Sequence, residues 1–403
     1  MKNAKILLIV CDGMGDLPSK ELGGKTPLEA AKKPNLDKMA AAGKKGLMHV
    51  LGKGIIPESD SAHLTLFGYD LKKHYVGRGP FEALGLGINL KHGDIAFRSN
   101  FATVGDDLAI IDRRAGRIEN CTELAKKLDN TRIRGVHFLV KPGTEHRAAV
   151  VMSGHGLSDK ISDGDPHSAG KKALEIIPLD KSKEAKFTAE VLNEFLRNAH
   201  TILDNHPLNL ERAQKGLPSA NYLLVRGAGE MKKVPSLRER FGLRACCIAG
   251  AGLYKGVAAF VGMDLFEVKG ATGTPQTDIK AKIARAIKEL EHFDYVFVHI
   301  KGCDIFGHDG KCLEKKKFVE KIDSALAPLL GLKDTLVIVT ADHSTPCSQK
   351  NHSADPVPVL FYGAGMKGGR AKGFGEKDCR KGALGVFEGK DLMKLAMKEA
   401  GRS

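Results

Sequence analysis

The stretch YVFVHIKGCDIFGH, residues 295–308, joins a predicted strand to two side chains that can bind metal. Residues 295–300 are apolar and rich in branched side chains, and helical patterns flank them, which predicts a buried strand of a parallel α/β sheet. Asp304 and His308 follow this strand directly. The loops beyond the carboxyl ends of parallel strands converge on one crevice, so we expect both side chains to lie there.

The same pattern recurs elsewhere in the chain and predicts the rest of the sheet. Three further apolar runs predict strands at residues 6–10, 336–340 and 357–362. Helical periodicity with suitable end signals predicts helices at residues 27–42, 278–291 and 315–330. Three of the four strands lie beyond residue 290 and the fourth opens the chain, so one sheet has to be assembled from both ends of the sequence.

The middle of the chain has a different character. Segments with alternating polarity, such as residues 94–104 and 147–152, and several glycine-rich turns replace the long apolar runs. We therefore predict an α/β fold in two domains. Residues 1–84 and 266–403 form a discontinuous domain with a mostly parallel sheet, and residues 85–265 form an inserted α+β domain.

Acidic and histidine residues lie near the ends of all four predicted strands. Six residues share this position: Asp12, Asp304, His308, Asp342, His343 and His352. Carboxylate oxygen and imidazole nitrogen are ligands of hard and borderline divalent ions, and no thiolate is needed. One ion cannot use six ligands, but two ions about 3.5–4 Å apart can, and such pairs catalyse phosphoryl transfer. The sequence therefore predicts a site with two metal ions.

A phosphoryl-transfer site also needs a nucleophile. The segment PESDSAH, residues 57–63, precedes an apolar helical stretch and places Ser59 or Ser61 near a helix N-terminus. Backbone amides and the helix dipole favour a phosphate at that position. Serine before a helix is also a common cap, so the pattern alone leaves both roles and both serines open.

The charge of the chain predicts an anionic partner without identifying it. The chain has 403 residues, a formal net charge of +15 and a pI near 9.3, which suits a nucleic acid, an acidic membrane or a phosphorylated substrate. The absence of Trp, the six Tyr and the lack of interleaved aromatic and basic residues argue against nucleic acid. The densest basic patch, residues 311–317, is typical of the solvated face of a helix.

Cysteine spacing and hydropathy favour a cytoplasmic protein. The eight cysteines form no C-x-x-C pair and no disulfide or zinc-knuckle pattern, which indicates reduced thiols. The first apolar run is too short for a signal peptide, and no stretch approaches the roughly 18 apolar residues of a membrane span. We expect no membrane partner, and no pattern indicates an oligomeric state.

Several motifs together resemble a known enzyme group. The strings IVCDGMGD (9–16), ESD (58–60), GYD (68–70), HIKGCDIFGHDG (299–310), ADH (341–343) and HSADPVP (352–358) resemble the alkaline phosphatase superfamily. The strings FRSNFATV (97–104), DRRAGR (112–117), SDGDPH (162–167) and LVRGAG (224–229) are similar to the archaeal-type 2,3-bisphosphoglycerate-independent phosphoglycerate mutases. The resemblance covers essentially the whole chain and implies an alkaline-phosphatase-like core.

The resemblance assigns roles to the candidate residues. It implies that Ser59 is the nucleophile and a fourth ligand of one metal, which Asp12, Asp342 and His343 also bind. The second metal would be bound by Asp304, His308 and His352. Relatives commonly have Val and Asn where this chain has Ser61 and His63, so Ser61 stays open as an alternative nucleophile. The metals implied are Mn²⁺ or Mg²⁺, and Co²⁺ or Zn²⁺ would also suit these ligands.

The implied reaction interconverts 3-phosphoglycerate and 2-phosphoglycerate through a phosphoserine, without 2,3-bisphosphoglycerate. The inserted domain would hold the substrate and exclude water. The expected substrate residues are Arg98, Arg113, Arg114, Arg147, Asp163, Asp165, His167, Arg226 and Lys301. A metal-dependent phosphomonoesterase, or another phosphomutase of the superfamily, is the alternative, since it would use the same ions and serine.

Overall fold

The computed structural model describes residues 3–363, 366 and 373–402, which form two compact units. The core unit comprises Met1–Tyr75 and Pro235–Ser403, and the inserted unit comprises Val76–Val234. Both boundaries precede the predicted ones. Helix α5 (Arg78–Gly85) packs on strands of the inserted unit, and strand β9 (Ala245–Ile248) pairs with the core strand β11 (Tyr295–Ile300). The second segment of the core unit therefore begins at Pro235, well before the predicted residue 266.

The core unit contains a mostly parallel sheet, as predicted, with eight strands among the described residues. Their order is β10, β9, β11, β1, β12, β13, β2 and β14. Besides β9 and β11, these strands are β1 (Lys5–Cys11), β2 (Lys44–His49), β10 (Asp264–Leu265), β12 (Thr335–Thr340), β13 (Val357–Tyr362) and β14 (Gly385–Glu388). Val10 of β1 is opposite His299 of β11 on one side and Thr340 of β12 on the other. The three central strands therefore end at the same level, which brings the residues that follow them together.

Strand β13 differs from the prediction, because it runs antiparallel to β12 and to β2. The start of β13 consequently lies at the same edge of the sheet as the ends of β1, β11 and β12. His352 precedes β13, so the reversed direction is what brings His352 to the edge that carries Asp12 and Asp342.

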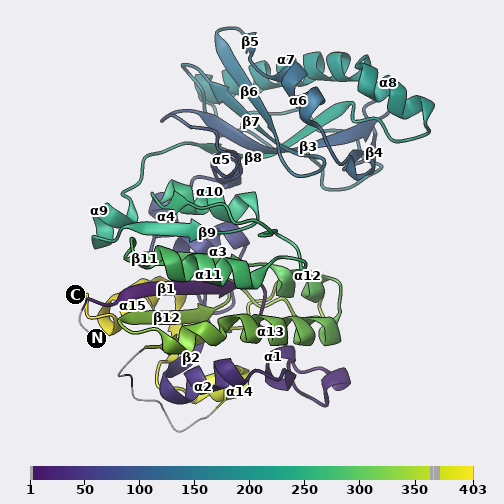
Figure 1. The fold of residues 1–403 in the computed structure, drawn as a ribbon. Coiled ribbons are helices and arrows are strands. Elements are labelled where there is room, and N and C mark those ends of the chain that lie inside the picture. Colours follow the sequence, from purple (N-terminus) through teal and green to yellow (C-terminus); the bar gives the residue numbers. More distant parts are fainter. Residues whose placement is uncertain (1–2, 364–365, 367–372, 403) are drawn as a thin grey trace. The chain divides into compact units, whose positions relative to one another are not determined.

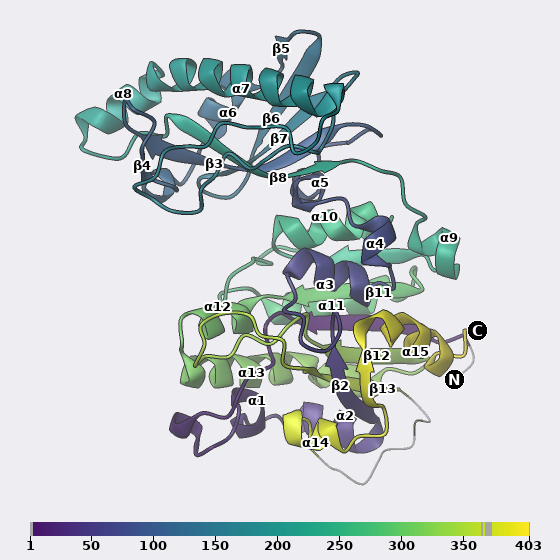
Figure 2. The same cartoon turned by 180° about the vertical axis from the view of Figure 1, so that it is seen from behind.

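Helices cover both faces of the core sheet. Figure 1 shows α11 and α13 in front of the sheet. Figure 2, the view from behind, shows α3 and α15 on the opposite face. The α-helices of this unit are α1 (Pro27–Ala30), α2 (Pro34–Ala42), α3 (Ser59–Leu66), α4 (Leu71–His74), α9 (Leu237–Phe241), α10 (Gly252–Phe260), α11 (Ile279–Glu289), α12 (Gly302–His308), α13 (Cys312–Leu326), α14 (Glu376–Arg380) and α15 (Leu392–Glu399).

The predicted helix at residues 27–42 is two helices. A capping box between Thr26 and Glu29 starts α1, but Ala31 is extended and α2 begins at Pro34. Proline has no backbone N–H to donate, and its ring clashes with the carbonyl four residues earlier, so the helix breaks before it. The predicted helix at residues 315–330 is α13 followed by the 3₁₀ turn Ala327–Gly331.

The inserted unit is an antiparallel sheet with helices, the α+β type that its alternating segments predict. Its strands are β3 (Ile95–Val104), β4 (Ile110–Asp112), β5 (Thr131–Ile133), β6 (Val136–Pro142), β7 (Arg147–Ser153) and β8 (Tyr222–Glu230). Besides α5, its helices are α6 (Thr122–Leu128), α7 (Lys183–Asp204) and α8 (Pro207–Gln214). The core lies between α7 and the sheet, where Phe138 and Phe195 stack with ring centroids 4.1 Å apart. None of the described helices in either unit has the length and apolar character of a membrane span.

A buried ion pair fixes the loop that follows β1. The Lys315 Nζ atom lies 2.7 Å from Asp16 Oδ2 and also donates to the carbonyls of Gly15 and Thr345. Lys315 is fully buried, whereas Lys311 and Lys317 are exposed, so the prediction of a solvated helix face over residues 311–317 is wrong for Lys315. Lys315 ties α13 to the loops that carry Asp12 and His343.

Lys315→Met should lower the free energy of unfolding by about 3–5 kcal/mol, because it leaves the Asp16 carboxylate buried without a cation. Urea denaturation of the metal-free chain measures this loss. Asp16→Asn combined with Lys315→Met should recover part of it, since the uncompensated charge is then gone. A single variant that unfolds at the wild-type urea concentration would contradict the interpretation.

Candidate metal centre and anion-binding residues

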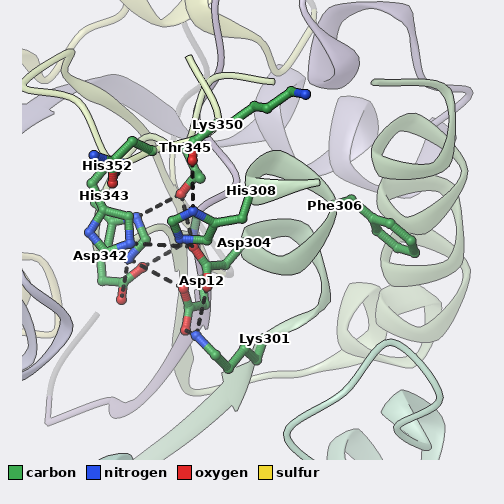
Figure 3. Close-up of polar contacts among 12 residues, drawn as sticks. Asp12, Lys301, Asp304, Phe306, His308, Asp342, His343, Thr345, Lys350 and His352 are labelled. Carbon is green, nitrogen blue, oxygen red and sulfur yellow. Dashed lines mark hydrogen bonds and ion pairs between the residues drawn. The ribbon is translucent and has the colours of Figure 1, made fainter. Parts of the chain in front are cut away.

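The six predicted metal ligands meet at the carboxyl edge of the core sheet (Figure 3). Asp12 follows β1, and Asp342 and His343 follow β12, while Asp304 and His308 lie on α12, directly after β11. His352 arrives from the loop before β13. Residues separated by more than three hundred positions thus become neighbours.

One group consists of Asp304, His308 and His352. His308 Nε2 lies 3.2 Å from Asp304 Oδ1, and His352 Nε2 lies 3.5 Å from the same oxygen. One potential ligand atom from each residue lies within 4.8 Å of the others, which is close enough for a single ion to contact all three. This is the set that the family resemblance assigns to one of the two metals.

The second group surrounds His343. Its Nε2 atom lies 3.4 Å from Asp12 Oδ1 and 3.3 Å from Asp342 Oδ2. Asp12 Oδ1, Asp342 Oδ2 and His343 Nε2 are buried, and none of them has a hydrogen-bond partner among the described residues. Buried polar atoms are rarely left without a partner. Carboxylate oxygens and an imidazole nitrogen suit a divalent cation, and one potential ligand atom each of Asp12, Asp304 and His343 lies within 4.8 Å of the others, so these residues fit a metal ion.

The histidine rings are oriented through their other nitrogen atoms. His308 Nδ1 lies 3.0 Å from the Lys350 carbonyl, His352 Nδ1 lies 3.0 Å from the Pro57 carbonyl, and His343 Nδ1 lies 3.0 Å from Thr345 Oγ1. A carbonyl oxygen only accepts, so Nδ1 of His308 and of His352 carries a proton, and Nε2, which faces Asp304, is the nitrogen that can bind a metal once it is deprotonated. Metal-binding histidines are held in this way, with one nitrogen bonded to the protein and the other facing the ion.

Burial and local charge set the protonation states. Burial lowers the pKa of His343 to about 3, so its imidazole is neutral at physiological pH, which is the form that binds metal. Burial acts to raise the pKa of Asp304, but hydrogen bonds with His308 and His352 and the charge of Lys301 hold it well below its usual range. Burial and the neighbouring Asp12 raise the pKa of Asp342. Such mutual repulsion between carboxylates is relieved by a shared cation.

Ser59 is the first residue of α3 and is buried. The Pro57 carbonyl, two residues earlier, contacts His352, and His63 Nδ1 lies 2.7 Å from the Ser59 carbonyl and 3.7 Å from Asp342 Oδ2. The segment 57–63, which contains Ser59, thus contacts one residue of each metal group. Ser61 is partly exposed, and its hydroxyl donates to the Glu58 carbonyl at 3.0 Å, a local bond of a serine to the backbone three residues earlier.

Lys301 lies between the two groups. Its Nζ atom is 3.1 Å from Asp12 Oδ2 and 2.8 Å from Asp304 Oδ2. The residue therefore bridges two of the predicted metal ligands, a role that the sequence analysis, which assigned it to substrate, did not foresee.

Sequence reasoning missed three further residues of the site. Tyr254 and His299 both contact Asp12 Oδ2, and Thr345 Oγ1 donates to Asp304 Oδ1 at 3.0 Å. His299 is the fifth residue of a predicted buried strand, where a histidine is unusual and could have been noticed. Tyr254 follows a glycine-rich turn with no signal of its own.

The predicted substrate residues all lie in the inserted unit, apart from Lys301, and three of them form one cluster around a carboxylate. Arg113 Nε and Nη2 donate to Asp165 at 3.0 and 2.6 Å, and Arg226 Nη1 also donates to Asp165 Oδ2. The Asp165 side chain is fully buried, so it fixes both guanidinium groups.

A second set of cations lies close to this carboxylate. Arg98 and Arg78 both pair with Glu82, at 3.6 and 3.2 Å. Burial, together with the charges of Arg78, Arg226 and Arg147, lowers the pKa of Arg98 to about 10 despite Glu82. Positive charge is thus in local excess, which favours an anion. Arg78 was not predicted.

The remaining predicted residues are more exposed. Arg147 pairs with Glu145 at 3.6 Å, Asp163 accepts from the Gly227 amide at 2.7 Å, and the His167 ring lies 3.9 Å from Asp163. The His167 amide donates to Asp165, which places its backbone, though not its ring, in the Asp165 cluster. Arg114 is exposed.

The fold and the metal-binding set define a metalloenzyme, and comparison with known proteins agrees. The sequence profile described as the metalloenzyme superfamily matches residues 4–399. A protein of Archaeoglobus fulgidus named 2,3-bisphosphoglycerate-independent phosphoglycerate mutase 1 is 50% identical, over 97% of each chain.

Solved structures lead to the same group. A protein of Pyrococcus horikoshii gives a TM-score of 0.87 at 36% identity, covering 100% of this chain and 99% of that one. The cofactor-independent phosphoglycerate mutase of Thermoplasma acidophilum gives 0.75 at 39% identity, covering 99% and 100%. The chain belongs to the 2,3-bisphosphoglycerate-independent phosphoglycerate mutase family of the metalloenzyme superfamily.

His352→Ala should weaken binding of one of two Mn²⁺ ions at least about tenfold, since even outer-shell partners of a metal contribute that much. Isothermal titration calorimetry of the metal-free chain measures the stoichiometry and both affinities. His155→Ala, at an exposed histidine of the inserted unit, is the matched control and should bind as the wild type does. Equal effects of the two substitutions would exclude His352 as a ligand.

Proposed function

We propose that the chain interconverts 3-phosphoglycerate and 2-phosphoglycerate through a phosphoserine on Ser59. The observation that carries the proposal is the set of three histidines, each held through Nδ1, whose Nε2 atoms face buried aspartate oxygens at the carboxyl edge of the sheet. The names of the relatives supply the substrate.

We propose that Asp12, Asp342, His343 and Ser59 hold one divalent ion and that Asp304, His308 and His352 hold the other. Mn²⁺ or Mg²⁺ is the proposed metal, and Co²⁺ or Zn²⁺ also suits oxygen and nitrogen ligands. When bound, the ions supply positive charge that neutralises the transferring phosphoryl group and acidifies the serine hydroxyl.

The protein residues carry out the transfer in two steps. Ser59 Oγ attacks phosphorus, the bond from phosphorus to O3 of the substrate breaks, and O3 takes up a proton as the Ser59 proton is released. Glycerate then turns within the site, and its O2 hydroxyl attacks phosphorus of the phosphoserine. The bond from phosphorus to Ser59 Oγ breaks, and Oγ takes up a proton as the O2 proton is released. The first turn of α3 supports the phosphoryl group with backbone amides, because Ser59 opens that helix.

The arginines of the inserted unit are proposed to bind the substrate carboxylate and to keep glycerate from leaving. Arg113 and Arg226 are fixed by Asp165, and Arg98 by Glu82, so their guanidinium groups are pre-oriented. We also propose substrate contacts for four residues at more exposed positions: Arg114, Arg147, Asp163 and His167. Exclusion of water distinguishes a mutase from a phosphatase, because water would otherwise hydrolyse the phosphoserine.

Ser59→Ala should abolish conversion of 3-phosphoglycerate to 2-phosphoglycerate, whereas Ser61→Ala should keep at least about a third of the rate, because it removes only a hydrogen bond to the Glu58 carbonyl worth about 1 kcal/mol to the fold. Phosphorus NMR with Mn²⁺ and without bisphosphoglycerate follows both isomers and inorganic phosphate. Free phosphate without 2-phosphoglycerate would favour the phosphomonoesterase alternative. Loss of activity in Ser61→Ala but not in Ser59→Ala would identify Ser61 as the nucleophile.

Arg226→Ala should raise KM for 3-phosphoglycerate about tenfold or more, since a hydrogen bond to a charged group is worth about 1.5–3 kcal/mol. Steady-state kinetics at saturating metal measures KM and kcat. Arg134→Ala is the control, because Arg134 pairs with Glu190 and Glu194 on the surface of the same unit. A KM that stays at the wild-type value would remove Arg226 from the substrate site.

A further inference from the structure

The two oxygens of Asp12 have opposite surroundings. Oδ2 accepts hydrogen bonds from the Tyr254 hydroxyl, from His299 Nε2 at 3.0 Å and from Lys301 Nζ at 3.1 Å. Oδ1 is buried without a hydrogen-bond partner among the described residues, and it faces His343 Nε2 at 3.4 Å. The carboxylate is therefore held by one oxygen and free at the other.

Tyr254 is one of the three donors to Asp12 Oδ2, and it contacts the other two. It lies on α10, its side chain is buried, and its ring stacks on His299 with centroids 3.4 Å apart and an interplanar angle of 19°. Its hydroxyl accepts from Lys301 Nζ at 3.0 Å while it donates to Asp12. Removing this one hydroxyl would take one of three donors from Asp12 Oδ2 and would leave Lys301 with one partner fewer.

We infer that Tyr254 is a positioning residue of the metal centre, which fixes the rotation of the Asp12 carboxylate so that Oδ1 is presented to a divalent cation. The inference rests on the proposed role of Asp12 as a metal ligand. The terminal torsion of an aspartate is broad, so the carboxylate is not fixed by its own rotamer preference. Outer-shell partners that orient a ligand typically change metal affinity about 10–100-fold.

His299 supports the same arrangement. His299 Nε2 lies 3.0 Å from Asp12 Oδ2, and an ionised carboxylate oxygen only accepts, so Nε2 donates this hydrogen bond. The stacked Tyr254 ring keeps the imidazole in place. Tyr254 thus acts on Asp12 both directly and through His299.

The test compares Tyr254→Phe with Tyr69→Phe. Both substitutions keep the ring and remove one buried hydroxyl, but the Tyr69 hydroxyl donates to the Pro235 carbonyl at 2.6 Å and does not touch Asp12. Calorimetric titration of the metal-free full chain with Mn²⁺ should show a dissociation constant about tenfold or more higher in Tyr254→Phe for one ion, and within about twofold of the wild type in Tyr69→Phe.

Two further measurements separate positioning from general loss of structure. The rate of Tyr254→Phe should return to within about threefold of the wild type when Mn²⁺ is raised to saturation, because the effect acts through occupancy of the metal site. Circular dichroism checks that the variant is folded. Should it unfold, His299→Phe, which removes another donor and keeps a ring, is expected to weaken Mn²⁺ binding to the same extent.

Unchanged Mn²⁺ affinity in folded Tyr254→Phe would overturn the inference, as would an equal loss in Tyr69→Phe. A reduced rate that saturating Mn²⁺ does not restore would also overturn it, because it would place Tyr254 in the reaction itself. Calorimetry needs no turnover. A chain that binds Mn²⁺ as described here but forms no 2-phosphoglycerate would therefore refute the proposed function and leave the role of Tyr254 standing.

Discussion

Three aspartate carboxylates lie buried at one edge of the core sheet, and the site depends on how their charge is compensated. Asp12 and Asp342 are fully buried and Asp304 is nearly so. An isolated ionised carboxylate is costly to bury, and several together repel one another. Lys301 supplies one positive charge between Asp12 and Asp304, which cannot balance three negative charges. Two divalent ions would more than balance the remainder, and the surplus positive charge is what a phosphoryl group requires.

This requirement explains the surroundings of the carboxylates. Each ligand histidine is anchored through Nδ1 by an oxygen, at Lys350, Pro57 or Thr345, and Lys350 and Thr345 both lie in the connection between β12 and β13. The Asp16–Lys315 pair in turn joins this connection to the loop after β1, because Lys315 also bonds the carbonyls of Gly15 and Thr345. The buried ion pair thus belongs to the scaffold of the site, although neither partner is proposed to bind metal.

The meeting of the six predicted ligands could be inferred from the sequence because their positions follow from strand ends. Buried strands are recognisable as short apolar runs, and loops after parallel strands must meet, so the aspartates that follow them are expected to be neighbours. The direction of β13 and the place of β9 in the core were less accessible, since both depend on pairing partners rather than on local composition. Pro34 is the local signal for the break between α1 and α2, and the prediction of one helix over residues 27–42 did not use it. Tyr254 and Asp12 are joined by a hydrogen bond over 242 positions, and no local pattern marks such a contact.

The net charge of the chain indicates an anionic ligand without saying which one. The local arrangement of side chains in the structure narrows the choice. A formal net charge of +15 suits any anion, yet the site that would recognise one is local. In the inserted unit, Asp165 holds Arg113 and Arg226 while Glu82 pairs with Arg78 and Arg98, so each acidic residue orients two guanidinium groups and neutralises only half their charge. Such an arrangement favours a small ligand whose carboxylate or phosphate fits between guanidinium groups held in fixed orientations. The half-buried pairing of these arginines therefore suits a small phosphorylated acid.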